Sequence, residues 1–78
     1  MKKFDGLAER VIAFRKKTGL TQQECAEKAG VSPNVIIQLE SGKGVVSTKS
    51  LERISQYLDS PEALKEDSLI WYVFGHND

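Results

Sequence analysis

Apolar residues recur along this chain at the spacing of helices. Leu7, Val11 and Phe14 lie at i, i+4 and i+7, which predicts a helix over about residues 5–17. The same pattern predicts further helices over about residues 22–29, 33–41 and 47–58. The expected fold class is therefore all-α, a compact bundle of four to five short helices.

Local signals set the expected ends of these helices. Asp5 is expected to cap the first helix, and Gly19 is expected to end it. Thr21 caps the second helix, with Glu24 three residues later completing a capping box. Ser47 is expected to cap the fourth helix. Each of these expected helix ends thus has a residue of a type that caps or terminates helices.

Residues 21–40 are typical of two short helices joined by a tight turn. Gly30 occupies the turn, where a residue that tolerates positive φ is favoured. Ser32 and Pro33 restart the helix as its cap and its first helical residue. Ala26 is expected to be small because the second helix crosses close to it. This is helix-turn-helix geometry, in which the second helix lies in the DNA major groove.

The stretch FRKKTGLTQQECAEKAGVSPNVIIQLESGK resembles the phage Cro and repressor family, also called XRE-like regulators. The resemblance covers about residues 7–58 and implies a lambda-repressor-like DNA-binding domain in a phage or bacterial regulator. The matching positions are Arg15, Gly19-Leu20-Thr21-Gln22, Ala26, Gly30-Val31-Ser32, Ile36 and Leu39-Glu40-x-Gly42-Lys43. The resemblance also implies an ion pair between Arg15 and Glu40 that ties the first helix to the end of the third.

The expected recognition helix can read bases and its neighbours can bind phosphate. Asn34 and Gln38 lie one turn apart, and amide side chains pair bidentately with adenine. Gln22 begins a helix, where backbone N–H groups bind phosphate. The residues expected to read bases are Ser32, Asn34, Val35, Ile37 and Gln38, and those expected to contact phosphates are Thr21, Gln22, Lys43, Ser47 and Lys49.

Charge is distributed unevenly, although the 78 residues carry no net charge. Residues 1–58 have a net charge of +4 and residues 59–78 have a net charge of −4. An acidic tail is expected to sit away from phosphate. The recognition helix has no Lys or Arg, which argues against tight DNA binding by a monomer.

The chain is expected to divide into a helix-turn-helix domain over residues 1–60 and an acidic and apolar tail over residues 61–78. Ser60 and Pro61 start another helix, while the apolar run 69–74 fits either a helix or a strand, with helix favoured. A small core cannot bury this whole run, so the tail is expected to mediate dimerisation. The residues expected in the dimer interface are Leu69, Ile70, Trp71, Val73 and Phe74.

Other chemistry is expected to be absent. Cys25 is interpreted as a buried small apolar residue where the family usually has Leu. His76 has no second ligand nearby, so no metal and no other cofactor is expected. The sequence shows no nucleophile–base pair and no phosphate-binding loop, which argues against an enzyme. With one cysteine, no signal peptide and no membrane span, a cytoplasmic protein is expected.

The sequence therefore favours a sequence-specific transcriptional regulator, a repressor that binds double-stranded DNA as a homodimer on an inverted repeat. An antitoxin-like module, which binds both operator DNA and a toxin through its tail, is the first alternative. The second is a module of the same fold that has lost DNA binding and binds another protein. The neutral charge favours this last alternative, whereas the set of Gln22, Asn34, Gln38 and Lys43 argues against it.

Overall fold

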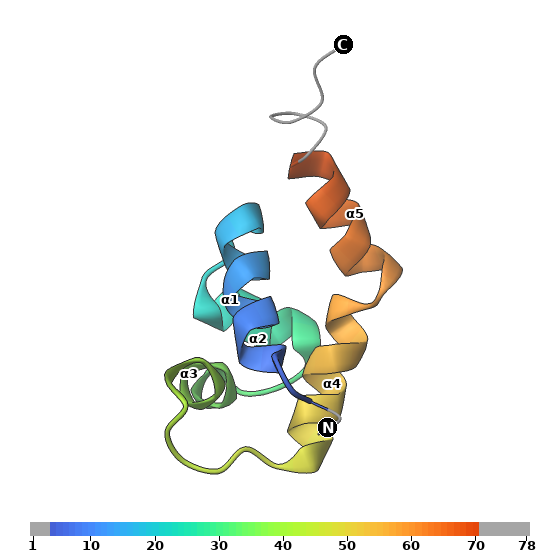
Figure 1. Ribbon diagram of the computed structural model, residues 1–78. Coiled ribbons are helices and arrows are strands. Elements are labelled where there is room, and N and C mark those ends of the chain that lie inside the picture. The colour runs from blue at the N-terminus through green and yellow to red at the C-terminus, as the bar shows by residue number, and fades with distance from the viewer. Residues whose placement is uncertain (1–3, 71–78) are drawn as a thin grey trace.

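The computed structural model describes residues 4–70, with side chains through residue 66. This part of the chain is all-helical (Figure 1). Its helices are α1 (Leu7–Thr18), α2 (Gln22–Ala29), α3 (Pro33–Ser41), α4 (Thr48–Leu58) and α5 (Pro61–Ile70). The expected fold class is confirmed.

The first four helices enclose the core, and α5 closes it from the side of α1 and α4. Figure 1 shows α3 at one end of the molecule and the last turns of α5 at the other. Leu7, Val11 and Phe14 form the buried stripe of α1, as their spacing predicted. The remaining buried residues are Cys25, Ala26, Ala29, Ile36, Ile54, Tyr57, Leu58 and Ala63.

The start of α1 differs from the sequence prediction. Asp5 does not cap the helix, because the N-cap position belongs to Gly6, which has a φ of 79° and makes no side-chain capping bond. The backbone N–H of Leu7 instead donates to the carbonyl of Phe4, and Phe4 packs against the core. A turn anchored by an aromatic residue therefore sets the start of α1.

The other predicted boundaries are confirmed. The Gly19 N–H donates to the Arg15 carbonyl and ends α1. The hydroxyl of Thr21 accepts from the Glu24 N–H while the Glu24 carboxylate accepts from the Thr21 N–H, which is the predicted capping box. The Ser47 hydroxyl caps α4 by accepting from the Ser50 N–H. These bonds fix where α2 and α4 begin.

The tail begins with a helix. In α5, Ala63 is 1% exposed and joins the core, while Leu64 is 57% exposed. The favoured helical interpretation of the tail is confirmed as far as Ile70. The side chains of Leu69 and Ile70, and Trp71, Val73, Phe74 and His76, lie outside the part described.

Candidate nucleic-acid interface

The turn between α2 and α3 sets the angle between these two helices. Gly30 has a φ of 79°, and its N–H donates to the carbonyls of Ala26 and Glu27. The Val31 N–H also donates to the Ala26 carbonyl, at 3.0 Å. On the opposite side of the turn, the Arg53 guanidinium of α4 donates to the Gly30 carbonyl. Bonds from both sides therefore hold the turn in the left-handed conformation that glycine tolerates.

Close packing of α3 on α2 depends on small and branched residues. Ala26 on α2 and Ile36 on α3 are both fully buried. A larger side chain at Ala26 would push the two helices apart, because protein interiors have almost no free volume. The small size that the sequence argument required at Ala26 thus has its reason in the packing of α2 and α3.

A polar cluster joins the first three helices. Arg15 of α1 and Glu40 of α3 form a two-pronged ion pair, with both N–O distances at 2.7 Å. The Gln22 side-chain amide of α2 donates to the same carboxylate at 3.1 Å. Arg15 also donates to the Leu20 carbonyl in the loop between α1 and α2. Sequence reasoning missed the bond from Gln22, because no local pattern links residues 18 positions apart.

Burial and bonding shift the charge equilibria of this cluster. The Glu40 side chain is 9% exposed, and its hydrogen bond from Arg15 lowers the pKa of its carboxyl group, with burial opposing and Gln22 assisting. The same hydrogen bond raises the pKa of Arg15. Both groups therefore stay charged near neutral pH, and the pair fixes the geometry of α1, α2 and α3.

The residues expected to read bases divide into two groups. Ser32, Asn34 and Ile37 are exposed on α3, and Ile37 is an exposed large apolar residue. Ser32 holds the N-cap position, but its side chain makes no capping hydrogen bond. Val35, expected on the outer face, is half-buried and packs against the core. The reason is that Val35 precedes Leu39 by one helical turn, and both lie on the flank of α3 that faces the core.

Gln38 lies between α3 and the loop that follows it. Its side chain is half-buried, and a Cβ atom built on Gly44 would lie 3.4 Å from its terminal amide. The Gln38 amide therefore lies beside Gly44, which has a φ of 79°. The sequence placed Gln38 on the groove face but gave no sign of this contact with the loop.

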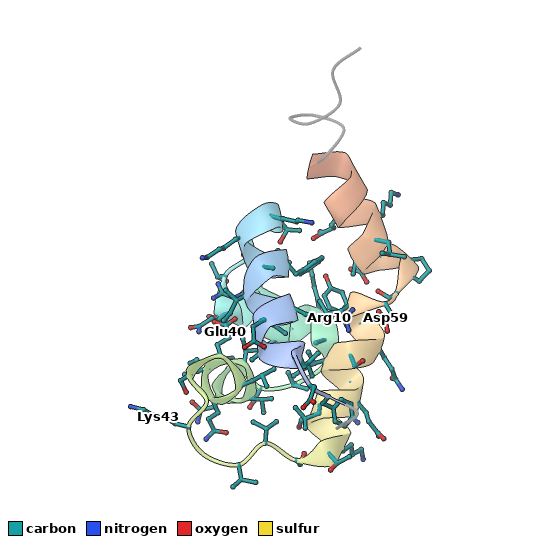
Figure 2. The ribbon with its side chains drawn as sticks, viewed as in Figure 1. Arg10, Glu40, Lys43 and Asp59 are labelled. Carbon is teal, nitrogen blue, oxygen red and sulfur yellow. The ribbon has the colours of Figure 1, made fainter. Side chains whose placement is uncertain are left out.

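The residues expected to contact phosphates lie at helix ends and in the loop after α3. Thr21 and Gln22 start α2, and Ser47 and Lys49 flank the start of α4. Figure 2 shows Lys43 extending from the loop after α3 into solvent. Lys43 and Lys49 are exposed, whereas the side-chain amide of Gln22 donates a hydrogen bond to Glu40 of the Arg15–Glu40 ion pair. Four of these positions thus lie at the starts of α2 and α4, and Lys43 lies in the loop between α3 and α4.

The structure also shows the surroundings of Cys25, outside the recognition surface. Cys25 is fully buried, and its burial raises the pKa of the thiol, which disfavours the reactive thiolate. The described residues contain no cluster of three potential metal ligands. They also contain no helix long and apolar enough to cross a membrane.

In this chain a glycine turn joins two helices, and the second helix presents polar residues to solvent. This arrangement defines the helix-turn-helix class of DNA-binding folds. A family model described as "Helix-turn-helix" matches residues 11–64. The chain therefore belongs to this family, the XRE-like helix-turn-helix proteins. It is also similar to a protein named "Uncharacterized HTH-type transcriptional regulator" from Archaeoglobus fulgidus, with 37% identity over 51 residues covering 65% of this chain and 73% of the relative. No solved structure matches the chain significantly.

Proposed function

We propose that this protein is a sequence-specific transcriptional regulator, a repressor that binds an inverted-repeat operator as a homodimer. The observation that carries the proposal is the exposed outer face of α3, with Asn34 and Ile37 free of the core, on a helix pair fixed by the Gly30 turn. In this arrangement α3 enters the major groove, where amide side chains recognise adenine. The name of the similar regulator supports the same class of function.

Phosphate contacts supply the rest of the affinity in this proposal. Thr21 and Gln22 at the start of α2, and Ser47 and Lys49 at the start of α4, face the backbone on either side of the groove. Lys43 reaches a phosphate from the loop after α3. Because these contacts displace counterions, binding falls steeply as salt rises.

Dimerisation supplies the specificity that one helix lacks. The recognition helix has no Lys or Arg, and a single helix reads few base pairs. Two copies related by a two-fold axis place their α3 helices in half-sites about 10 bp apart. The tail, residues 61–78, forms most of the dimer interface in this proposal.

Selection of bound sequences from random DNA tests the proposal directly. We expect an enriched inverted repeat, rich in A·T pairs where Asn34 and Gln38 reach the bases. On that site Gln38→Ala should cost about 1–3 kcal/mol in binding free energy and should cost little on random DNA. Gel shifts at fixed salt measure both affinities. If the wild-type chain binds selected and random duplexes equally, the proposed function is wrong.

The control for the Gln38 experiment is Lys43→Ala. Lys43 is exposed and is expected to touch phosphate alone, so its loss should weaken both DNAs to a similar degree. A Gln38→Ala variant that behaves like Lys43→Ala would show that Gln38 does not read bases.

A further inference from the structure

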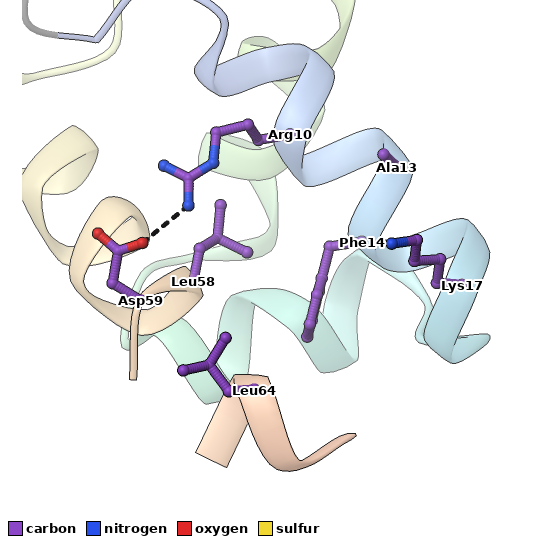
Figure 3. Close-up of a pocket in the computed structure, with 7 residues that line it drawn as sticks. All are labelled: Arg10, Ala13, Phe14, Lys17, Leu58, Asp59 and Leu64. Carbon is purple, nitrogen blue, oxygen red and sulfur yellow. Dashed lines mark hydrogen bonds and ion pairs between the residues drawn. The ribbon is translucent and has the colours of Figure 1, made fainter. Parts of the chain in front are cut away.

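A pocket of about 270 Å³ lies between α1 and α5, at the end of the core away from α3. Figure 3 shows Leu58 and Leu64 directed into this space, with the ring of Phe14 on the side of α1. The Arg10–Asp59 ion pair, at 2.9 Å, closes one end. We call this feature the α1–α5 groove; it is lined by Arg10, Ala13, Phe14, Lys17, Leu58, Asp59 and Leu64.

The α1–α5 groove has an apolar floor and an incomplete wall. Phe14 and Leu58 form the floor and are 9% and 7% exposed. Ala13 is exposed and too small to fill the space between the neighbouring turns of α1. Leu64 leaves 57% of its surface in water. Covering this apolar surface would be favourable, because burial removes it from water.

The size of the α1–α5 groove suits one large side chain. Pockets for drug-sized ligands are usually larger, at roughly 300–1,000 Å³, and carry several convergent polar groups. The polar groups at the ion-paired end of this groove are already bonded to each other. An apolar side chain from a protein segment is therefore the occupant that fits best.

The sequence after α5 supplies such a segment. Residues 71–74 are Trp-Tyr-Val-Phe, and the first turn-forming residue after them is Gly75. Leu64 precedes Ile70 by six residues, about 9 Å along a helix axis. To reach its own groove, the chain would have to reverse direction between Ile70 and Trp71, because Asp67 and Ser68, the turn-favouring residues before that point, lie within α5. A reversal at Gly75 would bring back only His76, Asn77 and Asp78.

We propose that the α1–α5 groove receives the aromatic segment 71–74 of a second copy of this chain. Under a two-fold axis each copy gives its segment and receives the other, so one contact is made twice. This inference rests on the proposed homodimer and names the surface on which the tail docks. Figure 1 shows α5, which forms one wall of the groove, away from α3, so the exchange leaves both recognition helices free for DNA.

The chain carries its own probe for this contact. Trp71 is the only tryptophan, so the emission of the full-length protein reports on the docked segment alone. We expect emission to shift to shorter wavelength as protein concentration rises through the dimerisation range measured by sedimentation. Emission that does not change with concentration while the protein dimerises would overturn the inference.

Two variants test the two walls of the groove. Leu64→Ser shortens the α5 wall, and Ala13→Glu places a carboxylate on the α1 wall; both positions are exposed, so the fold should survive. Each should weaken dimerisation by about tenfold or more and remove the emission shift. Ala13 also separates this arrangement from direct packing of α5 on α5, which would leave Ala13 uninvolved.

The matched control is Ile37→Ser on α3. Ile37 is 43% exposed, so this change removes a comparable exposed apolar side chain at the far end of the molecule. Its dimerisation should equal that of the wild type. If Ala13→Glu dimerises like the wild type, the groove does not receive the tail, although the homodimer proposal survives. If the wild type is monomeric at all concentrations yet binds a selected operator, the homodimer and the groove inference both fail while DNA recognition stands.

Discussion

Around α2 and α3 the polar side chains that set the geometry are largely buried, whereas the ion pairs around α5 lie at the surface. Glu40 accepts hydrogen bonds from both Arg15 and Gln22, and its side chain is 9% exposed. The α5 end is joined to α2 by Lys28, which contacts Glu62 at 3.2 Å and Glu66 at 3.5 Å on the surface. Exposed pairs of this kind contribute little to stability.

This difference separates a face that must keep its shape from one that can still accept a partner. A recognition helix needs a fixed angle to its neighbours, because small displacements misplace every side chain in the groove. In the homodimer that we propose, the α5 end needs no such precision until a second subunit completes it. The core ends there with Ala63 and the partly covered Leu64. Variants that act unequally on the two ends test this view.

The largest effect is expected from a larger side chain between α2 and α3. Ala26→Leu adds three carbon atoms at a fully buried site and should destabilise the fold by about 3 kcal/mol or more. The same substitution at the exposed Ala13, beside α5, should change stability by no more than about 0.5 kcal/mol. Denaturant unfolding followed by circular dichroism measures both. Equal effects at the two alanines would contradict the proposed contrast.

The two arginine pairs of α1 offer a second comparison. Arg15→Gln leaves the mostly buried Glu40 carboxylate without its partner and should cost about 2–3 kcal/mol. Arg10→Gln breaks the exposed pair with Asp59, whose side chain is 68% exposed, and should cost less than about 1 kcal/mol. Thermal and urea unfolding at one protein concentration compare them. A larger loss of stability in Arg10→Gln than in Arg15→Gln would show that the Arg10–Asp59 pair beside α5 contributes more to stability than the Arg15–Glu40 pair.

The sequence predicted the bounds of α2 and α3 better than it predicted side-chain contacts between residues that are far apart along the chain. The bounds of α2 and α3 followed from Thr21, Gly30 and Pro33, because capping and turn chemistry act between near neighbours. The contact of Gln38 with Gly44 had no such signal, since it depends on the path of the loop after α3. The start of α1 was missed for a related reason: Gly6 holds the N-cap position, and the turn before it includes Phe4, whose packing on the core leaves no local signal.

The ion pairs between α2 and α5 were also hard to predict from the sequence. Lys28 reaches Glu62 and Glu66 over more than thirty positions, and nothing in the spacing of charges distinguishes these residues from solvated ones. The Arg15–Glu40 pair was expected only through the resemblance to a family. Long-range side-chain partners depend on the folded arrangement of helices, so local sequence patterns carry no record of them.

Falling pH should remove the stabilisation that the Arg15–Glu40 pair supplies to α1, α2 and α3. The hydrogen bond from Arg15 holds the folded-state pKa of Glu40 below the ordinary glutamate value of about 4.3. The stability that this pair contributes is therefore complete above about pH 4.3 and is lost as the pH falls through the folded-state pKa. Arg15→Gln should flatten this part of the stability profile, while Arg10→Gln should leave it unchanged. Parallel profiles for wild type and Arg15→Gln between pH 5 and 2 would contradict the assignment.

The smallest expected effect distinguishes two glycines of the loop after α3. Gly42 and Gly44 have φ values of 73° and 79°, so an alanine at either position carries a similar backbone strain. Only at Gly44 does the added Cβ meet a side chain, because it lies 3.4 Å from the Gln38 amide, whereas nothing lies within 4 Å at Gly42. Gly44→Ala should therefore restrict the conformations of Gln38 as well as strain the loop.

If Gln38 reads a base, Gly44→Ala should alter the preference at one position of each half-site and leave the other positions unchanged. Gly42→Ala should match it in stability, with a loss of about 1 kcal/mol, and should keep the wild-type preference. Affinities for duplexes that differ from the selected operator at single positions measure this. A change of preference in both variants would trace the effect to the loop as a whole. A change in Gly44→Ala alone would mean that the loop after α3 positions Gln38 for recognition.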